Sequence, residues 1–189
     1  MNILYCGDRN IEKGIIMSAI SVGLHALDPL HVYILTMDWQ ENDSHYEMIS
    51  SSCVDRVNCY LKDLNEESFA KRIILPDSWK KLIDGVNVQT RFTPYCMLRL
   101  FADMLEELPD KILYLDADVI CRVNPRDFYE MDISDYEVAG VLDYYGSWFF
   151  RKRWYRRDYI NSGVMLLNLK KIRENKMFVE CRNLFRRMS

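Results

Sequence analysis

The stretch Lys111 to Cys121 reads K-I-L-Y-L-D-A-D-V-I-C, and the fold can be worked out from it in both directions. Four apolar or aromatic residues, Ile112 to Leu115, run directly into two aspartates one residue apart, and apolar residues resume at Val119. This pattern predicts a buried strand that ends in a pair of acids. Residues i and i+2 of an extended backbone project to the same side, so we expect Asp116 and Asp118 to face one point in space.

Two carboxylates at such a short separation repel each other unless a cation or a proton lies between them. At an effective dielectric constant of about 20 and a separation of about 4 Å, the repulsion is about 4 kcal/mol. A hard divalent cation with oxygen ligands would relieve it and keep coordination positions open for the oxygens of a phosphate-bearing substrate. The alternative interpretation is two solvated acids at a strand end.

Length and charge restrict the class of protein. The 189 residues suit one domain with a sizeable core. Lys and Arg total 25 against 28 for Asp and Glu, which gives a net charge of -3 and argues against a dedicated nucleic-acid binder. The first residues carry no basic region and no long apolar segment, so we expect neither a signal peptide nor a membrane span, and a cytoplasmic location.

The cysteines and histidines do not have metal-ligand spacing. The six cysteines contain no C-x-x-C pair and lie mostly within apolar runs, which favours reduced, buried thiols over a structural zinc site. The three histidines all lie in the first quarter of the chain. These residues are Cys6, Cys53, Cys59, Cys96, Cys121 and Cys181, with His25, His31 and His45.

The chain opens with the pattern of a βαβ unit. An apolar strand at Asn2 to Cys6 is followed by the turn Gly7-Asp8-Arg9-Asn10 and by helical spacing from Ile11 to Leu27. Ligands collect at the carboxyl ends of strands in open α/β sheets, so Cys6 to Asn10 is a candidate edge of a site. Gly7 allows close approach of the backbone, and Asp8 and Asn10 offer acceptors and donors to a base or ribose. The alternative is ordinary turn and N-cap chemistry.

The remaining pattern predicts further strands and helices of a mostly parallel sheet covered on both faces. We expect a polar, weakly helical segment at Asp38–Ser52, and an irregular connection at Lys62–Asn87. Expected helices cover Pro94–Leu108 and Lys170–Met188. The expected strands are His31–Met37, Val54–Leu61, Val138–Leu142 and Val164–Leu169, with an Asn161-Ser162-Gly163 turn before the last.

Two features keep alternatives open. Arg99, in the helix before the central strand, either pairs with Asp103 at i+4 or points its guanidinium at Asp116. The segment Tyr144 to Tyr159 interleaves aromatic and basic residues. It could stack on sugar faces, touch anionic head groups, grip a nucleic acid, or form a lid packed on its own domain.

The order of Asp8, Arg99, Y-L-D-A-D and N-S-G-V-M-L-L-N-L resembles the family 8 retaining glycosyltransferases over nearly all 189 residues. That family includes bacterial lipopolysaccharide galactosyl- and glucosyltransferases and, more distantly, glycogenin. The resemblance implies a Rossmann-like GT-A-type α/β fold, a UDP-glucose or UDP-galactose donor, and Mn2+, with Mg2+ as the substitute. It also implies a saccharide or glycolipid acceptor such as lipopolysaccharide.

The resemblance implies roles for residues at matching positions. Cys6, Gly7, Asp8 and Asn10 would line the uridine site, and Arg99 would support the donor. Asp116 and Asp118 would hold the metal on the diphosphate. Asp143, Asn161, Ser162 and Gly163 would face the transferred sugar and the acceptor. No residue stands out as a nucleophile.

One departure from the family pattern is plain. Family members continue with an acidic motif resembling D-Q-D and a segment resembling H-x-x-G-x-x-K-P-W, and neither occurs in these 189 residues. We therefore expect the nucleotide-binding part of a longer enzyme or a truncated product, which keeps the donor pocket but loses metal affinity and most turnover.

The sequence thus predicts a metal-dependent retaining UDP-hexose glycosyltransferase. A non-catalytic sugar-nucleotide-binding or interaction fragment is the first rival. A UDP-sugar-forming nucleotidyltransferase is disfavoured because Cys6 to Lys13 offers only one glycine. An RNA-binding role for Tyr144–Tyr159 is disfavoured by the net charge, and a peripheral membrane contact rests on Arg151 to Arg157 alone.

Overall fold

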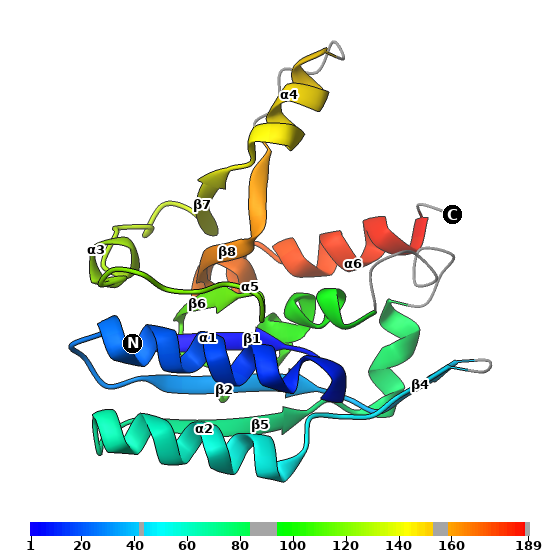
Figure 1. Cartoon of the computed structure of the whole chain (residues 1–189). Helices are drawn as coiled ribbons and strands as arrows, with labels where there is room; N and C mark the ends of the chain where they lie inside the picture. Colours follow the sequence, from blue (N-terminus) through cyan, green and yellow to red (C-terminus); the bar gives the residue numbers. More distant parts are fainter. Residues whose placement is uncertain (42–43, 84–93, 153–158, 188–189) are drawn as a thin grey trace.

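A computed structural model describes residues 1–41, 44–83, 94–152 and 159–187 of the chain. Six strands form one sheet in the order β5-β2-β1-β6-β8-β7 (Figure 1). The pairs β1–β2, β1–β6 and β2–β5 are parallel, and β8 runs antiparallel to both β6 and β7. The mostly parallel sheet predicted from the sequence is confirmed. Its strands are β1 (Asn2–Cys6), β2 (His31–Thr36), β5 (Phe69–Ile74), β6 (Lys111–Leu115), β7 (Val138–Leu142) and β8 (Ile160–Asn168).

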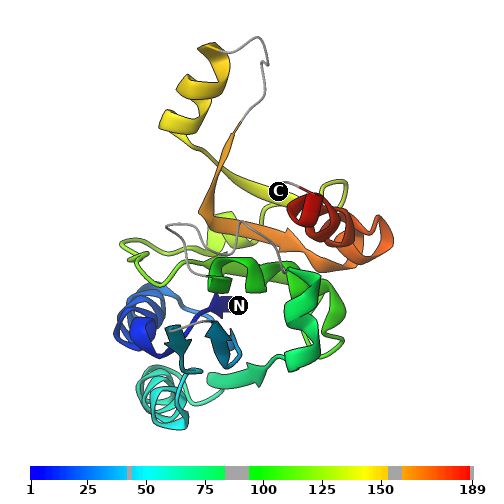
Figure 2. The same ribbon diagram turned by 90° about the vertical axis from the view of Figure 1, so that its right-hand side faces the viewer.

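Helices cover both faces of this sheet, with α1 and α2 on one side and η4 and α6 on the other (Figure 2). Alternate residues of each strand therefore enter different cores: Leu113 packs in the cluster on the α1–α2 side, and Tyr114 in the cluster on the η4 side. The helices are η1 (Arg9–Ile11), α1 (Glu12–His25), α2 (Ser51–Leu64), η2 (Asp77–Leu82), η4 (Pro94–Met104), α3 (Arg126–Tyr129), α4 (Tyr144–Lys152), α5 (Leu169–Glu174) and α6 (Met177–Arg187).

The strand predicted at Val54–Leu61 is wrong, because these residues lie in helix α2. Its buried residues Val54, Val57 and Leu61 are three and four positions apart, which is helical spacing. The Ser50 hydroxyl caps the helix by accepting the Cys53 N–H at 3.2 Å. The β-branched valines suggested a strand, but the cap and the burial on one face favour a helix.

The neighbouring segments also differ from the prediction. The polar segment Asp38–Ser52 contains a two-stranded hairpin, β3 (Trp39–Glu41) and β4 (Ser44–Tyr46), before α2 begins. The connection Lys62–Asn87 contains β5, whose lysine and arginine mask the strand pattern because the strand lies at the edge of the sheet.

The predicted helices at Pro94 and Lys170 form with altered geometry. The first, η4, is a 3₁₀ helix. The second is divided into α5 and α6 at Asn175 and Lys176, where Lys176 adopts a positive φ of 56°. Such a residue ends one helix in the left-handed conformation and redirects the chain, so α6 packs back on η4.

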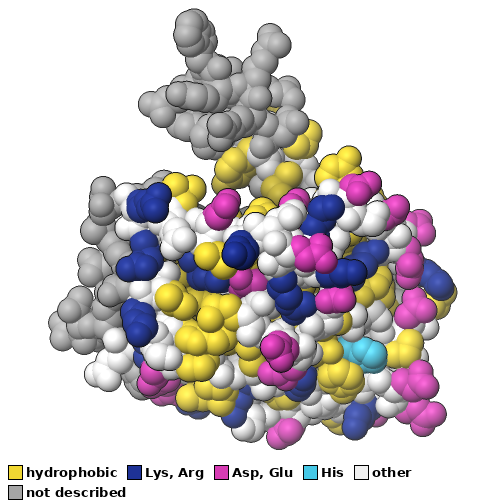
Figure 3. Space-filling model, turned by 180° about the vertical axis from the view of Figure 1, so that it is seen from behind, with side chains coloured by type: hydrophobic (Ala, Val, Ile, Leu, Met, Phe, Trp, Pro, Cys, Tyr) yellow, Lys and Arg dark blue, Asp and Glu magenta, His cyan; other side chains and the backbone are white. Residues whose placement is uncertain are grey.

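The β7–β8 pair continues beyond the body of the molecule and carries α4 at its tip (Figure 1). Tyr144 and Tyr145 on α4 are 80% and 81% exposed, so these two residues at the start of the aromatic-basic segment do not pack on the domain as a lid would, whereas Tyr159 at its end lines the cavity described below. Hydrophobic side chains gather where this projection leaves the body (Figure 3). The basic positions Arg153, Arg156 and Arg157 lie outside the described residues. Within the described parts, no helix is both long enough and apolar enough to cross a membrane.

Candidate functional site

A cavity of about 820 Å³ opens at the carboxyl ends of β1 and β6, between η4, β8 and α6. This is the edge of a parallel sheet where ligands bind in α/β proteins. Seven of the residues singled out from the sequence line it, which brings four separate segments of the chain to one place. They are Cys6, Gly7, Asp8, Arg99, Asp116, Asp118 and Ser162.

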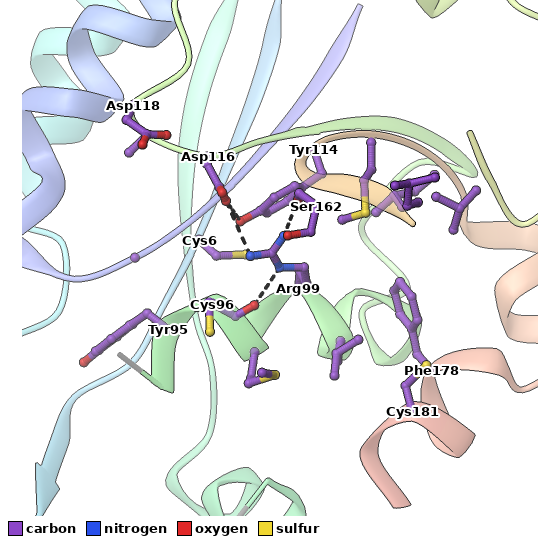
Figure 4. A pocket seen from close by; sticks show the side chains of 18 of the residues that line it. Cys6, Tyr95, Cys96, Arg99, Tyr114, Asp116, Asp118, Ser162, Phe178 and Cys181 are labelled. Atoms are coloured by element: carbon purple, nitrogen blue, oxygen red, sulfur yellow. Dashed lines mark hydrogen bonds and ion pairs between the residues drawn. The ribbon is translucent and has the colours of Figure 1, made fainter. Parts of the chain in front are cut away.

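Arg99 lies at the centre of this cavity and is itself 9% exposed (Figure 4). Its Nε donates to the Cys96 carbonyl at 2.6 Å, and its Nη1 donates to the Ser162 carbonyl. Its Nη2 lies 3.4 Å from Asp116 Oδ1. The guanidinium is thus fixed by two backbone carbonyls and presents its charge to Asp116.

This arrangement settles the two alternatives for Arg99. The i+4 partner Asp103 is engaged by Arg182 of α6 instead, at 2.6 Å. The reason is geometric, because η4 has three residues per turn and positions i and i+4 do not share a face as they do in an α-helix.

The expectation that Asp116 and Asp118 share one side of an extended backbone is wrong. Strand β6 ends at Leu115, and Asp116 to Val119 form a turn in which the Val119 N–H donates to the Asp116 carbonyl at 3.1 Å. Both carboxylates still line the cavity, but Asp116 points toward Tyr114 and Arg99, while Asp118 lies on the far side of the turn (Figure 4).

Tyr114 is the partner of Asp116 that the sequence reasoning missed. Its hydroxyl donates to Asp116 Oδ1, and its ring lies under the Arg99 guanidinium with 4.1 Å between Cζ and the ring centroid. Burial raises the pKa of the Tyr114 phenol well above its usual value, so the group remains a donor. The sequence held a signal for this contact, because Tyr114 and Asp116 are two positions apart at the end of β6 and such residues lie on the same face of a strand.

The loop that follows β1 both lines the cavity and caps a helix, so the two interpretations of Cys6 to Asn10 hold together. Asp8 is buried and lines the cavity, yet its carboxylate also caps η1, accepting the Asn10 backbone N–H at 3.2 Å and Asn10 Nδ2 at 3.0 Å. Asn10 is exposed and is not among the cavity-lining residues. Gly7 needs no positive φ, but a Cβ there would lie 2.0 Å from Ile11 Cδ1, so the close packing of η1 favours glycine.

The predicted Asn161-Ser162-Gly163 turn is also wrong, since these residues lie within β8. They form a hydrogen-bonded chain toward the acidic turn: Asn161 Oδ1 accepts the Gly163 N–H at 2.8 Å, and the Gly163 carbonyl accepts the Asp116 N–H at 2.8 Å. Asn161 Nδ2 donates to Asp143 Oδ2 at 3.5 Å. Only Ser162 of this segment lines the cavity.

Asp143 follows β7 and begins helix α4. Its Oδ1 accepts the Gly146 N–H at 2.6 Å, and its carbonyl accepts the Ser147 N–H at 2.9 Å. Its carboxylate therefore has a capping function and is not among the cavity-lining groups. A direct role of Asp143 or Asn161 toward a sugar stays a prediction.

Three cysteines line the cavity, Cys6 on β1, Cys96 on η4 and Cys181 on α6. Burial is the main cause that raises the pKa of all three thiols, so they are protonated at neutral pH. Their side chains form a polarizable, weakly polar part of the cavity wall. Tyr95 and Cys96 were not picked out from the sequence, where nothing distinguished them from other apolar positions of the predicted helix.

The residues present fit a cation only in part. Two carboxylates, Asp116 and Asp118, are hard oxygen ligands at the cavity wall. Across residues 1–41, 44–83, 94–152 and 159–187, no group of three or more His, Cys, Asp or Glu side chains is placed to hold a metal ion. A bound cation would therefore need further oxygens from a ligand or from water.

The sheet order, with β8 antiparallel, defines an open, mostly parallel α/β domain. Its acid-lined cavity lies at the carboxyl ends of the strands, where such domains bind ligands. The chain belongs to glycosyl transferase family 8, whose family model matches residues 2–189. The family predicted by resemblance is confirmed.

Curated relatives are considerably longer than this chain. Glucoside xylosyltransferase 1 of Rattus norvegicus is 28% identical over 182 residues, covering 90% of this chain and 38% of the relative. Glycosyltransferase GlyA of Streptococcus pneumoniae serotype 4 is 29% identical over 160 residues, covering 83% of this chain and 21% of the relative.

Solved structures share the fold. The galactosyltransferase LgtC, in complex with donor and acceptor sugar analogs, superimposes with a TM-score of 0.71 at 22% identity, covering 97% of this chain and 65% of that chain. Glycosyltransferase GlyE of Streptococcus pneumoniae TIGR4, in its apo form, gives a TM-score of 0.69 at 20% identity, covering 97% of this chain and 37% of that chain. The GT-A-type fold expected from the sequence is confirmed.

Proposed function

We propose that this chain is the donor-binding part of a retaining glycosyltransferase that takes a sugar from a UDP-sugar and transfers it to a saccharide acceptor. One observation carries the proposal: in a chain of family 8, Asp8, Arg99, Asp116 and Asp118 line a single cavity at the carboxyl ends of two parallel strands. This edge of the sheet suits a nucleoside diphosphate, because its phosphates need cationic partners and its ribose hydroxyls need hydrogen-bond acceptors.

Different residues of the chain would contact different parts of the donor and its cation. Asp8 would accept hydrogen bonds from the base or ribose at the end of β1. Arg99 would hold its charge toward the diphosphate, since its two carbonyl contacts keep it in place without a ligand. Asp116 and Asp118 would be the protein ligands of a divalent cation, Mn2+ by preference.

When bound, that cation would stabilise as a Lewis acid the negative charge on the departing diphosphate. Asp143 and Asn161, which contact each other where the β7–β8 extension meets α4, would lie toward the acceptor side. Of the described residues, none is placed as an evident nucleophile, so attack of the acceptor on the same face as the leaving group is the mechanism we favour.

The donor sugar remains a choice between a hexose and a pentose. Resemblance to the lipopolysaccharide transferases favours UDP-glucose or UDP-galactose with a lipopolysaccharide or other cell-surface glycan as acceptor. The rat relative is named a glucoside xylosyltransferase, which makes UDP-xylose the third donor to test.

Isothermal titration calorimetry with UDP, with and without MnCl2, tests the proposal. We expect UDP to bind, and to bind more tightly with MnCl2. Asp118→Asn should lose the increase with MnCl2, whereas Asp135→Asn, an exposed acid away from the cavity, should keep it. The absence of UDP binding at every MnCl2 concentration would contradict the proposal.

A second candidate is a UDP-sugar-binding chain with little turnover. It is favoured by the incomplete ligand set of the described residues. Hydrolysis of UDP-glucose, UDP-galactose and UDP-xylose with MnCl2 separates the two candidates. Binding without release of sugar from any donor would favour the second.

A further inference from the structure

The Asp116 carboxylate is held asymmetrically at the cavity wall. Its Oδ1 accepts hydrogen bonds from both the Tyr114 hydroxyl and Arg99 Nη2. Its Oδ2 lies on the other side, against Gly163, where a Cβ would come within 2.9 Å of this oxygen. The side chain is 38% exposed and lines the cavity, and only Oδ1 has these two protein donors.

Tyr114 is itself rigidly placed. It is almost fully buried in the core on the η4 side of β6, and the Arg99 guanidinium covers its ring at 4.1 Å. Only its hydroxyl reaches out of the core toward the turn. The terminal torsion of an aspartate is broad, so a fixed donor on one oxygen is what selects a single orientation of the carboxylate plane.

Gly163 completes the arrangement from the opposite side. Its carbonyl accepts the Asp116 N–H at 2.8 Å, which fixes the backbone of the aspartate next to β8. The missing side chain of Gly163 leaves room for Oδ2. A methyl group there would also come within 3.1 Å of Asn161 Oδ1, the oxygen that accepts the Gly163 N–H.

We propose that Tyr114 is a positioning residue that orients the Asp116 carboxylate, so that Oδ2 is presented to a divalent cation while Oδ1 stays with the protein. This inference rests on the proposed function, because it assigns Tyr114 a role in the same donor site. Tyr114 acts through Asp116 and not on the nucleotide itself. Groups that orient a metal ligand in this way typically contribute about 10- to 100-fold to metal affinity.

The test compares Tyr114→Phe with the unchanged chain. The substitution keeps the ring and its contact with Arg99 and removes only the hydroxyl. We expect UDP without metal to bind as before, and the affinity for Mn2+ in the presence of UDP to fall about 10- to 100-fold. Mn2+ binding is followed by electron paramagnetic resonance and by calorimetry, with MnCl2 raised to saturation.

Tyr5→Phe is the matched control. Tyr5 is also a fully buried strand tyrosine whose hydroxyl donates to a side chain, Ser18 Oγ at 2.9 Å, but it is not among the cavity-lining residues. It should lose a comparable amount of stability and keep its Mn2+ affinity. Gly163→Ala is an independent second variant, which disturbs the carboxylate from the Oδ2 side and should also lose Mn2+ affinity.

The outcomes separate the inference from the function on which it rests. If the unchanged chain binds no Mn2+ with UDP, the metal part of the proposed function fails, and the inference fails with it. If the unchanged chain binds Mn2+ and Tyr114→Phe binds it equally well, only the inference is overturned. Equal losses in Tyr114→Phe and Tyr5→Phe would likewise overturn it, because a general loss of stability would then explain the effect.

Discussion

Arg182 on α6 and Asp103 on η4 form a two-pronged ion pair, with the guanidinium nitrogens 2.6 and 3.1 Å from the carboxylate oxygens. Both side chains are less than a tenth exposed, and Arg182 also donates to the Leu100 carbonyl. The pair fastens the last helix to η4, which carries Arg99, and so fixes one wall of the cavity.

Removing one partner of this pair should destabilise the fold strongly. We expect Arg182→Ala to lower the free energy of unfolding by about 3–5 kcal/mol, because Asp103 is left buried and uncompensated. Arg186→Ala, on the exposed side of the same helix, should change it by less than about 0.5 kcal/mol. Urea unfolding followed by circular dichroism measures both. An additive double variant Asp103→Ala/Arg182→Ala would contradict the coupling.

Gly14 and Gly23 lie in the same helix, α1, and should respond oppositely to alanine. Alanine normally stabilises a helix interior by up to about 1 kcal/mol relative to glycine. A Cβ at Gly14 would lie 2.7 Å from the Ala117 carbonyl oxygen, so the backbone of the acidic turn must move. We expect Gly14→Ala to lower the melting temperature and to weaken Mn2+ binding with UDP.

Gly23→Ala is the comparison for this substitution. Its Cβ would meet only the ends of flexible side chains, Leu64 Cδ1 at 2.8 Å and Leu61 Cδ2 at 3.1 Å. Thermal melts should show little loss or a gain for this variant. The same loss for both variants would mean that contact with the acidic turn is not what restricts Gly14.

The titration of His31 should contribute part of the pH dependence of the free energy of unfolding. Burial, followed by the nearby N-terminal amine, lowers its pKa below the usual 6.5, and its ring stacks on Phe69 with Nδ1 3.2 Å from Asn2 Oδ1. The unfolded chain therefore binds more protons at this site below about pH 6.5, so stability is full above that pH and falls as the pH drops toward the folded-state pKa.

The variant His31→Gln should remove this contribution. Its free energy of unfolding should fall less between pH 7.5 and pH 5 than that of the unchanged chain. Urea titrations at the two pH values give the comparison. Equal losses in both proteins would refute the assignment to His31.

The thiols should differ in their rates of alkylation. Cys59 is exposed, whereas Cys53 is buried, and burial raises its pKa to about 11. Relative to a pKa of 9.0, this lowers the thiolate fraction near pH 8 by about 100-fold. With iodoacetamide at pH 8, mass spectrometry should find Cys59 modified first, and Cys6 and Cys53 modified only after unfolding in urea. Rapid labelling of Cys6 in the folded chain would show that the cavity wall opens.

The sequence predicted the central part of the fold well because buried parallel strands are nearly continuous apolar runs. Residues 2–6 and 111–115 were placed correctly for this reason. Residues 138–142 were also placed correctly from their apolar run, although β7 is an antiparallel edge strand of half-buried and exposed residues. The prediction failed between Asp38 and Ile74. There the valines of α2 suggested a strand, and the lysine and arginine of the edge strand β5 concealed one. Periodicity over a few residues cannot decide between the two when only one face is buried.

The sequence by itself determined the chemistry available: two acids after a buried strand, an arginine one helix earlier, and a motif order that identifies the family. The tertiary structure alone decided the partners. Asp116 leaves β6 through a turn, Arg99 lies on a 3₁₀ helix that turns it away from Asp103, and Tyr114 meets both at one cavity. These contacts join residues up to 63 positions apart, such as Arg99 and Ser162, and such contacts depend on how the elements pack rather than on any local pattern.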